Sequence, residues 1–260
     1  MGLFIKYMSI HLKSQLQYRT SFILLTLGQF FAPLGVFAGM YLMFERFGGL
    51  PGWSLHEVAL CYGVIHFAYS FSDCFGRGFD KLSTLVMAGD FDRLLVRPRS
   101  AALQVLGSRV EFSRIGRLLQ SIAVFAWALS HLPQAWSLPK LLVLLFMIAN
   151  GVLVFLGIFI LAAAFCFWTV QALEVVNIFT DGGREMAQYP LNIYEKWVTR
   201  FFTFVIPFSC VSYIPLMYVL DKREGDPLLW LLVPFSGVLF LLPCLLLWRF
   251  GVRHYRSTGS

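Results

Sequence analysis

The sequence predicts an all-α integral membrane protein with six transmembrane helices in one domain covering residues 1–260. Of its 260 residues, 58% are apolar and only 13% are charged, about half the charged fraction of an ordinary soluble domain. Five charge-free stretches are long enough to cross a bilayer, which takes about 20 helical residues. The positive charges also divide unequally between the two expected membrane sides. The net charge of +7 therefore reflects membrane topology, and we expect no nucleic-acid partner.

Residues 1–19 predict a helix that lies in the membrane interface ahead of the first span. Four apolar residues share one helical face and three polar residues share the opposite face: Ile5, Met8, Leu12 and Leu16, against Lys6, Lys13 and Gln17. A disordered tail is the alternative. The spacing of Val36-Phe37-Ala38 fits a signal-peptide cleavage site, but the apolar run before it is too long for one.

We expect the six spans at residues 20–44, 58–79, 112–132, 141–168, 197–220 and 228–248. The stretch free of charge in the second span is short, but its apolar character continues past Asp73 and Arg77. These two residues are four apart, so they share a helical face and can form an intramembrane ion pair. A pair that orients the helices is a more common use of such residues than a proton relay. Arg114 and Arg117, at the start of the third span, are expected to reach out to the interface.

The charges predict that both termini are cytoplasmic. With this orientation, 17 Lys and Arg residues lie inside and four outside, as the positive-inside rule requires. If residues 58–79 were not a span, the split would be 15 to 6, so charge alone does not fix the number of spans. The continuing apolar run favours six.

Sequence motifs for catalysis are missing. The chain contains no Gly-Lys dipeptide, so it lacks the phosphate-binding loop of nucleotide-hydrolysing motors. His56-Glu57 resembles the start of a zinc-protease motif, but Leu60 stands where the second histidine is needed. The five cysteines have no metal-binding spacing. We expect no catalytic residue, no metal site and no cofactor in this chain.

The longest cytoplasmic loop predicts a short amphipathic helix over residues 90–97. Asp90 is a suitable N-cap, and Pro98 ends the segment. Phe91, Leu94 and Leu95 lie on one side, and the other side carries Asp92, Arg93 and Arg97. Such a helix suits a groove on a soluble partner, with Phe91 as its anchor. A loop helix that lies on the membrane surface is the alternative.

The motifs resemble those of type-2 ABC exporter permeases, in particular a group of bacterial ABC transport system permeases. The resemblance rests on four short motifs: Gly89-Asp90-Phe91-Asp92-Arg93-Leu94-Leu95-Val96-Arg97-Pro98, Tyr189-Pro190-Leu191-Asn192-Ile193-Tyr194, Phe204-Val205-Ile206-Pro207-Phe208 and Tyr213-Ile214-Pro215. It implies a permease in the bacterial inner membrane that pairs with a second permease. It also implies two cytoplasmic ATPase subunits, which bind ATP and Mg, and a coupling role for the 90–97 helix.

Two segments depart from simple spans. Residues 171–189 are too polar for lipid and predict a cytoplasmic or interfacial helix, with a plain linker as the alternative. In the fifth span, Pro207 and Pro215 each remove a backbone hydrogen bond. We therefore expect its outer half to be kinked or partly re-entrant, and the family resemblance implies the same.

Gly35 and Gly39 form a G-x-x-x-G pair on the first span. Such a pair lets two helices approach closely, either within the chain or between subunits. Residue patterns by themselves leave two functions open, an ATP-coupled permease and a self-sufficient channel or scaffold. The docking-like helix and the resemblance favour the permease.

Overall fold

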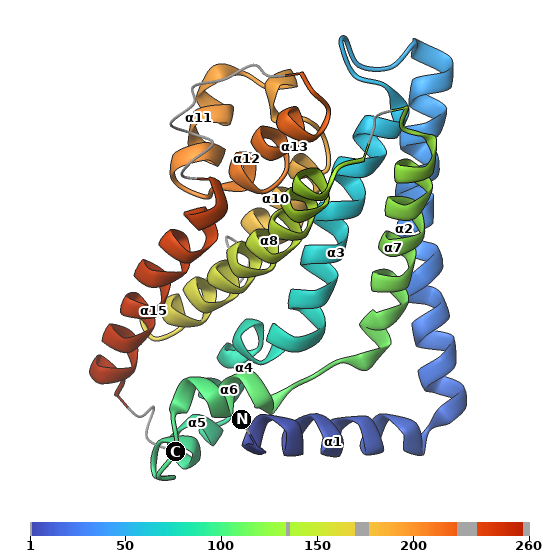
Figure 1. The fold of residues 1–260 in the computed structure, drawn as a ribbon. Helices are drawn as coiled ribbons and strands as arrows, with labels where there is room; N and C mark the ends of the chain where they lie inside the picture. The colour runs from blue at the N-terminus through green and yellow to red at the C-terminus, as the bar shows by residue number, and fades with distance from the viewer. Residues whose placement is uncertain (1, 134–135, 170–176, 223–232, 257–260) are drawn as a thin grey trace.

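The computed structural model describes residues 2–133, 136–169, 177–222 and 233–256, and the regular structure within them is helical (Figure 1). The first part contains α1 (Gly2–Gln17), α2 (Arg19–Phe47), α3 (Leu55–Asp80), α4 (Leu82–Met87), α5 (Asp90–Leu95), α6 (Ala101–Ser108), η1 (Phe112–Arg114), α7 (Ile115–His131) and α8 (Leu138–Phe165). The second part contains η2 (Ile178–Gly182), α10 (Gly183–Ala187), η3 (Leu191–Ile193), α11 (Lys196–Phe204), α12 (Phe208–Val211), α13 (Tyr213–Val219), η4 (Val233–Phe235) and α15 (Ser236–His254).

Four helical stretches of the described chain are long and apolar enough to cross a membrane: α2, α3 together with α4, α8 and α15. The pair formed by α11 and α12–α13 adds a fifth if it counts as one bent span. α7 has 17 residues and directly continues the turn of η1. An all-helical, multi-pass membrane protein is therefore confirmed, while the number of six spans stays a prediction.

α3 is the central helix of the bundle. It starts with a capping box, in which Ser54 accepts a hydrogen bond from the Glu57 amide and the Glu57 carboxylate accepts one from the Ser54 amide. Within its apolar part, 83% of the residues are buried inside the chain. α7 packs on one side of α3 and α8 on another, so α3 touches lipid very little (Figure 1).

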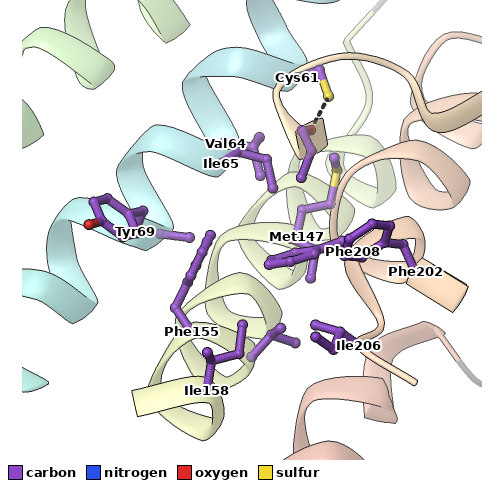
Figure 2. Packing of buried hydrophobic residues seen from close by; sticks show 14 of the residues in the cluster. Cys61, Val64, Ile65, Tyr69, Met147, Phe155, Ile158, Phe202, Ile206 and Phe208 are labelled. Carbon is purple, nitrogen blue, oxygen red and sulfur yellow. Dashed lines mark hydrogen bonds between the residues drawn. The ribbon is translucent and has the colours of Figure 1, made fainter. Parts of the chain in front are cut away.

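The apolar core lies between α3, α8 and the bent pair. Figure 2 shows Ile65 and Tyr69 of α3 facing Phe155 of α8, with Phe208 on the far side. The rings of Tyr69 and Phe155 are 5.2 Å apart, and those of Phe155 and Phe208 are 5.2 Å apart. Small residues permit the closest helix contacts: a Cβ atom added at Gly78 of α3 would lie 1.8 Å from the Val105 carbonyl oxygen of α6.

Residues 177–188 lie beside α3, with Thr180, Gly183, Ala187 and Gln188 buried against the rest of the chain. The Cys61 thiol donates a hydrogen bond to the Ala187 carbonyl, and the Tyr69 hydroxyl donates one to Asp181. The segment therefore runs antiparallel to α3, with Asp181 near its middle and Ala187 near its start. This differs from the helix that we expected outside the spans over 171–189, of which residues 170–176 lie outside the described part. Two of its polar residues, Asp181 and Gln188, form hydrogen bonds with Tyr69 and His66 of α3.

The expected span at 197–220 is bent by 74° between α11 and α12–α13. Pro207 lies in the break, as predicted. Pro215 lies in the first turn of α13, where the missing amide removes no hydrogen bond within that helix. α11, α12 and α13 gather at the end of the bundle that holds the α2–α3 connection, where Trp53 contacts Tyr213 (Figure 1).

The bend changes the membrane side on which two positive charges are expected. Lys196 and Arg200 belong to α11, so they lie at the end opposite α5 and not on the side we expected from the charge count. The split then becomes 15 to 6, still in the direction of the positive-inside rule. The start of α1 and the C-terminal end of α15 lie at the end that carries α5 and α6, and α1 lies across it (Figure 1).

Candidate functional site

The predicted loop helix is present as α5, with slightly different limits. Gly89 has a φ of 70°, which favours glycine, and it takes the N-cap position that we expected Asp90 to fill. Asp90 is instead the first helical residue, and its carboxylate lies 3.2 Å from Arg93. The helix ends at Leu95, with Val96 as its C-cap. A sharp glycine turn therefore sets where α5 begins.

Phe91 faces the interior of the chain. Its side chain is fully buried, and its ring lies 5.4 Å from Phe167, 6.4 Å from Trp248 and 5.1 Å from Tyr255. Phe91 therefore fastens α5 to the ends of α8 and α15 and is not available to a partner's groove in this structure. The expectation of Phe91 as the docking anchor is corrected, because an aromatic ring finds an aromatic pocket within its own chain.

The remaining residues of the predicted coupling set divide between two faces. Leu94 is partly buried, and its carbonyl accepts a hydrogen bond from Gln104. Asp92 lies beside Tyr255, and burial together with this carboxylate raises the pKa of the Tyr255 hydroxyl. The outward surface consists of the Arg93 side chain, which is 78% exposed, Val96, which is 83% exposed, and the exposed residues Leu95 and Arg97. We call these four residues the α5 surface.

A cluster of charges joins α2, α3 and α7 in the half of the bundle near α5. The predicted ion pair is confirmed, with Arg77 Nη1 2.6 Å from Asp73 Oδ1. Arg114 and Arg117 do not reach out to the interface as expected, because they lie 3.2 and 3.7 Å from Asp73 Oδ2. Both also donate hydrogen bonds to Gln29 of α2. The buried Asp73 thus collects three arginines, which a reading of neighbouring residues could not reveal.

A second polar cluster joins α3 to η2 and α10. Arg184 lies 3.3 Å from Asp181 and 2.6 Å from Glu185, and its guanidinium sits over the Tyr69 ring at 4.6 Å. One turn further, His66 Nε2 is 3.0 Å from the Gln188 side-chain oxygen. We expected this polar segment outside the spans, so its sequence did not predict the cluster. The signal was present in Tyr69 and His66, two polar aromatic residues within an apolar run.

Asn150 of α8 holds together the ends of three helical segments. Its amide nitrogen donates to the Cys210 carbonyl, the Val233 carbonyl and the Ser236 hydroxyl, and its oxygen accepts a 2.6 Å hydrogen bond from the Gly237 amide. Backbone groups at a helix break need such partners when water is excluded. Asn150 was not singled out from the sequence, although it is an amide within a charge-free stretch of 33 residues.

A family model described as "ABC-2 family transporter protein" matches residues 30–259, which is most of the chain. The chain belongs to the ABC-2 transporter family. No match was found among curated proteins or among solved structures. The resemblance to ABC-2-type permeases is therefore confirmed, and the bacterial branch stays a prediction.

Membership of the ABC-2 family identifies the chain as a membrane component of a transporter. The charged clusters around Asp73 and Arg184 are consistent with this role, since ionisable residues within spans face protein or water and seldom lipid. The match begins at residue 30, so it includes most of α2 and leaves out α1. The Asp90 to Arg97 segment lies within it.

The ABC-2 permease offers little reaction chemistry in its described residues. No group of three His, Cys, Asp or Glu residues in this part of the chain lies close enough to hold a metal ion. All five cysteines are free and buried. A cavity of about 500 Å³ lies between α8, α11 and α15, and apolar side chains such as Leu161, Phe201 and Phe240 line almost all of it. The one polar side chain in its described lining is that of Thr169.

Proposed function

We propose that the chain is the permease subunit of an ABC exporter, driven by a separate ATPase that binds the α5 surface. Two such ATPase subunits would carry ATP and Mg on the cytoplasmic side, and a second permease, identical or related, would complete the pathway. The proposal places the protein in the bacterial inner membrane, with both termini in the cytoplasm. A chain without a phosphate-binding loop needs a partner to supply this energy.

The attachment of α5 carries the proposal. Phe91 packs against Phe167 and Trp248, and Trp248 in turn packs edge-on against Phe79 at 5.3 Å. A partner that pushes on the α5 surface would therefore move the ends of α3, α8 and α15 together. Arg93, Val96 and Arg97 extend from this fixed base into solvent. A rigid base with an exposed tip suits the transfer of force, whereas a loop that lies on the membrane would not need the aromatic pocket.

The test changes exposed residues of the α5 surface and leaves Phe91 and its aromatic contacts intact. Arg93→Glu combined with Val96→Glu should leave the melting temperature of the purified permease almost unchanged, because both side chains are exposed and surface ion pairs contribute little. The double variant should bind the cognate ATPase at least tenfold more weakly, and the permease should no longer stimulate ATP hydrolysis. Lys13→Glu is the matched control, an exposed charge reversal nearer the α2 end of α1 and away from α5 (Figure 1).

Normal ATPase binding and stimulation by the double variant would refute the coupling role of α5. If the purified chain conducts solutes in liposomes with no ATPase present, the channel alternative replaces the permease. If the purified chain binds no ATPase and passes no solute, the scaffold alternative replaces the permease.

A further inference from the structure

A pocket of about 610 Å³ lies where α1, the start of α2 and the segment before α7 meet. Gln15 fixes one wall, because its amide nitrogen donates to the Val110 carbonyl at 2.6 Å and its oxygen accepts from the Phe112 amide at 3.0 Å. His11 lies 3.0 Å from the Gly107 carbonyl on the same side. The walls therefore belong to a well-connected part of the fold, at the corner between α1 and α2 in Figure 1.

The polar side of this elbow pocket has an excess of positive charge. Arg109 and Arg114 line it against one carboxylate, Glu111. Burial alone would raise the pKa of Glu111, but Arg77, Arg114 and Arg109 lower it below its usual value, so the carboxylate stays ionised. The Glu111 carboxylate accepts a hydrogen bond from Arg109 Nε at 2.8 Å. Within the described chain, the two terminal nitrogens of Arg109 have no partner, and its side chain is 53% exposed.

Hydroxyl groups line the same pocket as Arg109. Ser14, Tyr18 and Ser21 all line it, and Tyr18 is 71% exposed. The two terminal NH2 groups of the Arg109 guanidinium, together with several hydroxyls, can donate hydrogen bonds to the oxygens of a phosphate group. Phe22 and Leu25 of α2 also line the pocket and give it an apolar part.

The apolar part of the pocket continues along α2. Of the four long apolar stretches, α2, α3 with α4, α8 and α15, α2 has the smallest buried share. Only Pro33 and Met40 of its 29 residues are buried, and Leu25 is 58% exposed. A ligand in the pocket would therefore have its polar part on Arg109 and its apolar part along α2. A free phosphate would use only the first half of this surface.

We propose that the elbow pocket binds an anionic glycerophospholipid from the leaflet next to α1, with its phosphate on Arg109 and its acyl chains along Phe22 and Leu25. Basic pockets between helices near the membrane surface bind lipid headgroups in this way. The lipid joins α1, α2 and the Arg109–Glu111 segment, so it fixes the angle at which α1 leaves the bundle.

Lipid binding is measured on the purified permease in nanodiscs, without any ATPase, so its result is separate from that of the stimulation assay. Adding phosphatidylglycerol to phosphatidylcholine discs should raise the melting temperature of the wild type. Arg109→Gln should lose most of this rise, and native mass spectrometry should show roughly tenfold less retained phosphatidylglycerol, the scale of one charge-assisted hydrogen bond.

Lys13→Gln is the control, because Lys13 is an exposed cation on α1 that does not line the pocket. It should behave as the wild type. Ser21→Leu, which fills the pocket and keeps every charge, should lose the rise as Arg109→Gln does, and it serves if Arg109→Gln folds poorly. Retention of the lipid by both pocket variants would overturn the proposal, as would an equal loss in Lys13→Gln. An equal rise from inorganic phosphate in discs of phosphatidylcholine alone would assign the pocket to a free anion and refute the lipid.

Discussion

At the scale of single residues, Asn150 joins three segments that are far from it in the sequence. Its four hydrogen bonds reach Cys210, the turn at Val233 and the start of α15. These groups are buried, and buried polar groups need hydrogen-bond partners within the protein. One amide side chain therefore fixes where the bent pair and the last helix meet α8.

Replacing this amide should cost stability. Asn150→Leu keeps the size of the side chain but leaves the Gly237 amide without its acceptor, and an unsatisfied buried group costs about 1–3 kcal/mol. We expect a lower melting temperature in detergent. Asn192→Leu, at an exposed position, is the control and should melt as the wild type does. Equal melting of both variants would show that Asn150 is dispensable.

Phe91 is the second residue whose role the structure changes. Phe91→Ala empties a fully buried site, and such truncations in well-packed cores cost roughly 3–5 kcal/mol. We expect a lower melting temperature and weaker ATPase stimulation together, because α5 loses its base. The pair Arg93→Glu and Val96→Glu should instead lose stimulation at an unchanged melting temperature. If Phe91→Ala melts as the wild type does, Phe91 does not fasten α5.

At the scale of helices, α2 differs from its neighbours because it buries so little. A Cβ atom added at Gly35 or Gly39 would meet no atom within 4 Å, so these glycines pack against no described part of the chain. At Gly116 of α7, by contrast, an added Cβ would lie 2.0 Å from the Thr26 carbonyl oxygen of α2. Of the two roles that the sequence left open for Gly35 and Gly39, the one within the chain is removed.

The remaining role predicts contact with the second permease. Gly35→Leu with Gly39→Leu should fold normally, with a stability change within about 0.5 kcal/mol, and should weaken the permease dimer on native gels and in cross-linking. Gly116→Leu should instead destabilise the single chain, because the added side chain meets the α2 backbone. If the double variant assembles normally, α2 does not form the interface through these glycines.

At the scale of the whole molecule, the position of α11 can be tested by chemical labelling. Lys196→Cys and Ser137→Cys should both react with an impermeant thiol reagent in intact cells, because both positions lie at the end opposite α5 (Figure 1). Lys13→Cys should react only after lysis. The native cysteines are buried, so the wild-type background is suitable. Protection of Lys196→Cys alongside labelling of Ser137→Cys would restore the cytoplasmic position that the charge count favoured.

The sequence by itself determined the properties that depend on local composition. Apolar runs such as 20–44 and 141–168 dictate helices that cross a membrane, because nothing else satisfies the backbone in lipid. The spacing of Asp73 and Arg77 fixes their pairing on one helix, and Pro207 fixes a break. Motifs around Asp90 and Pro207 were also enough to identify the family.

Only the tertiary structure decided which polar groups meet across helices. Arg114 reaches Asp73, Asp181 reaches Tyr69, and Asn150 reaches Gly237, all between residues far apart in the sequence. The local sequence around a polar side chain in a span does not show whether the side chain faces lipid, water or another polar residue. Its neighbours depend on which helices pack beside it. For the same reason, Phe91 looks like an exposed anchor on an isolated helix, and only the positions of α8 and α15 turn it inward.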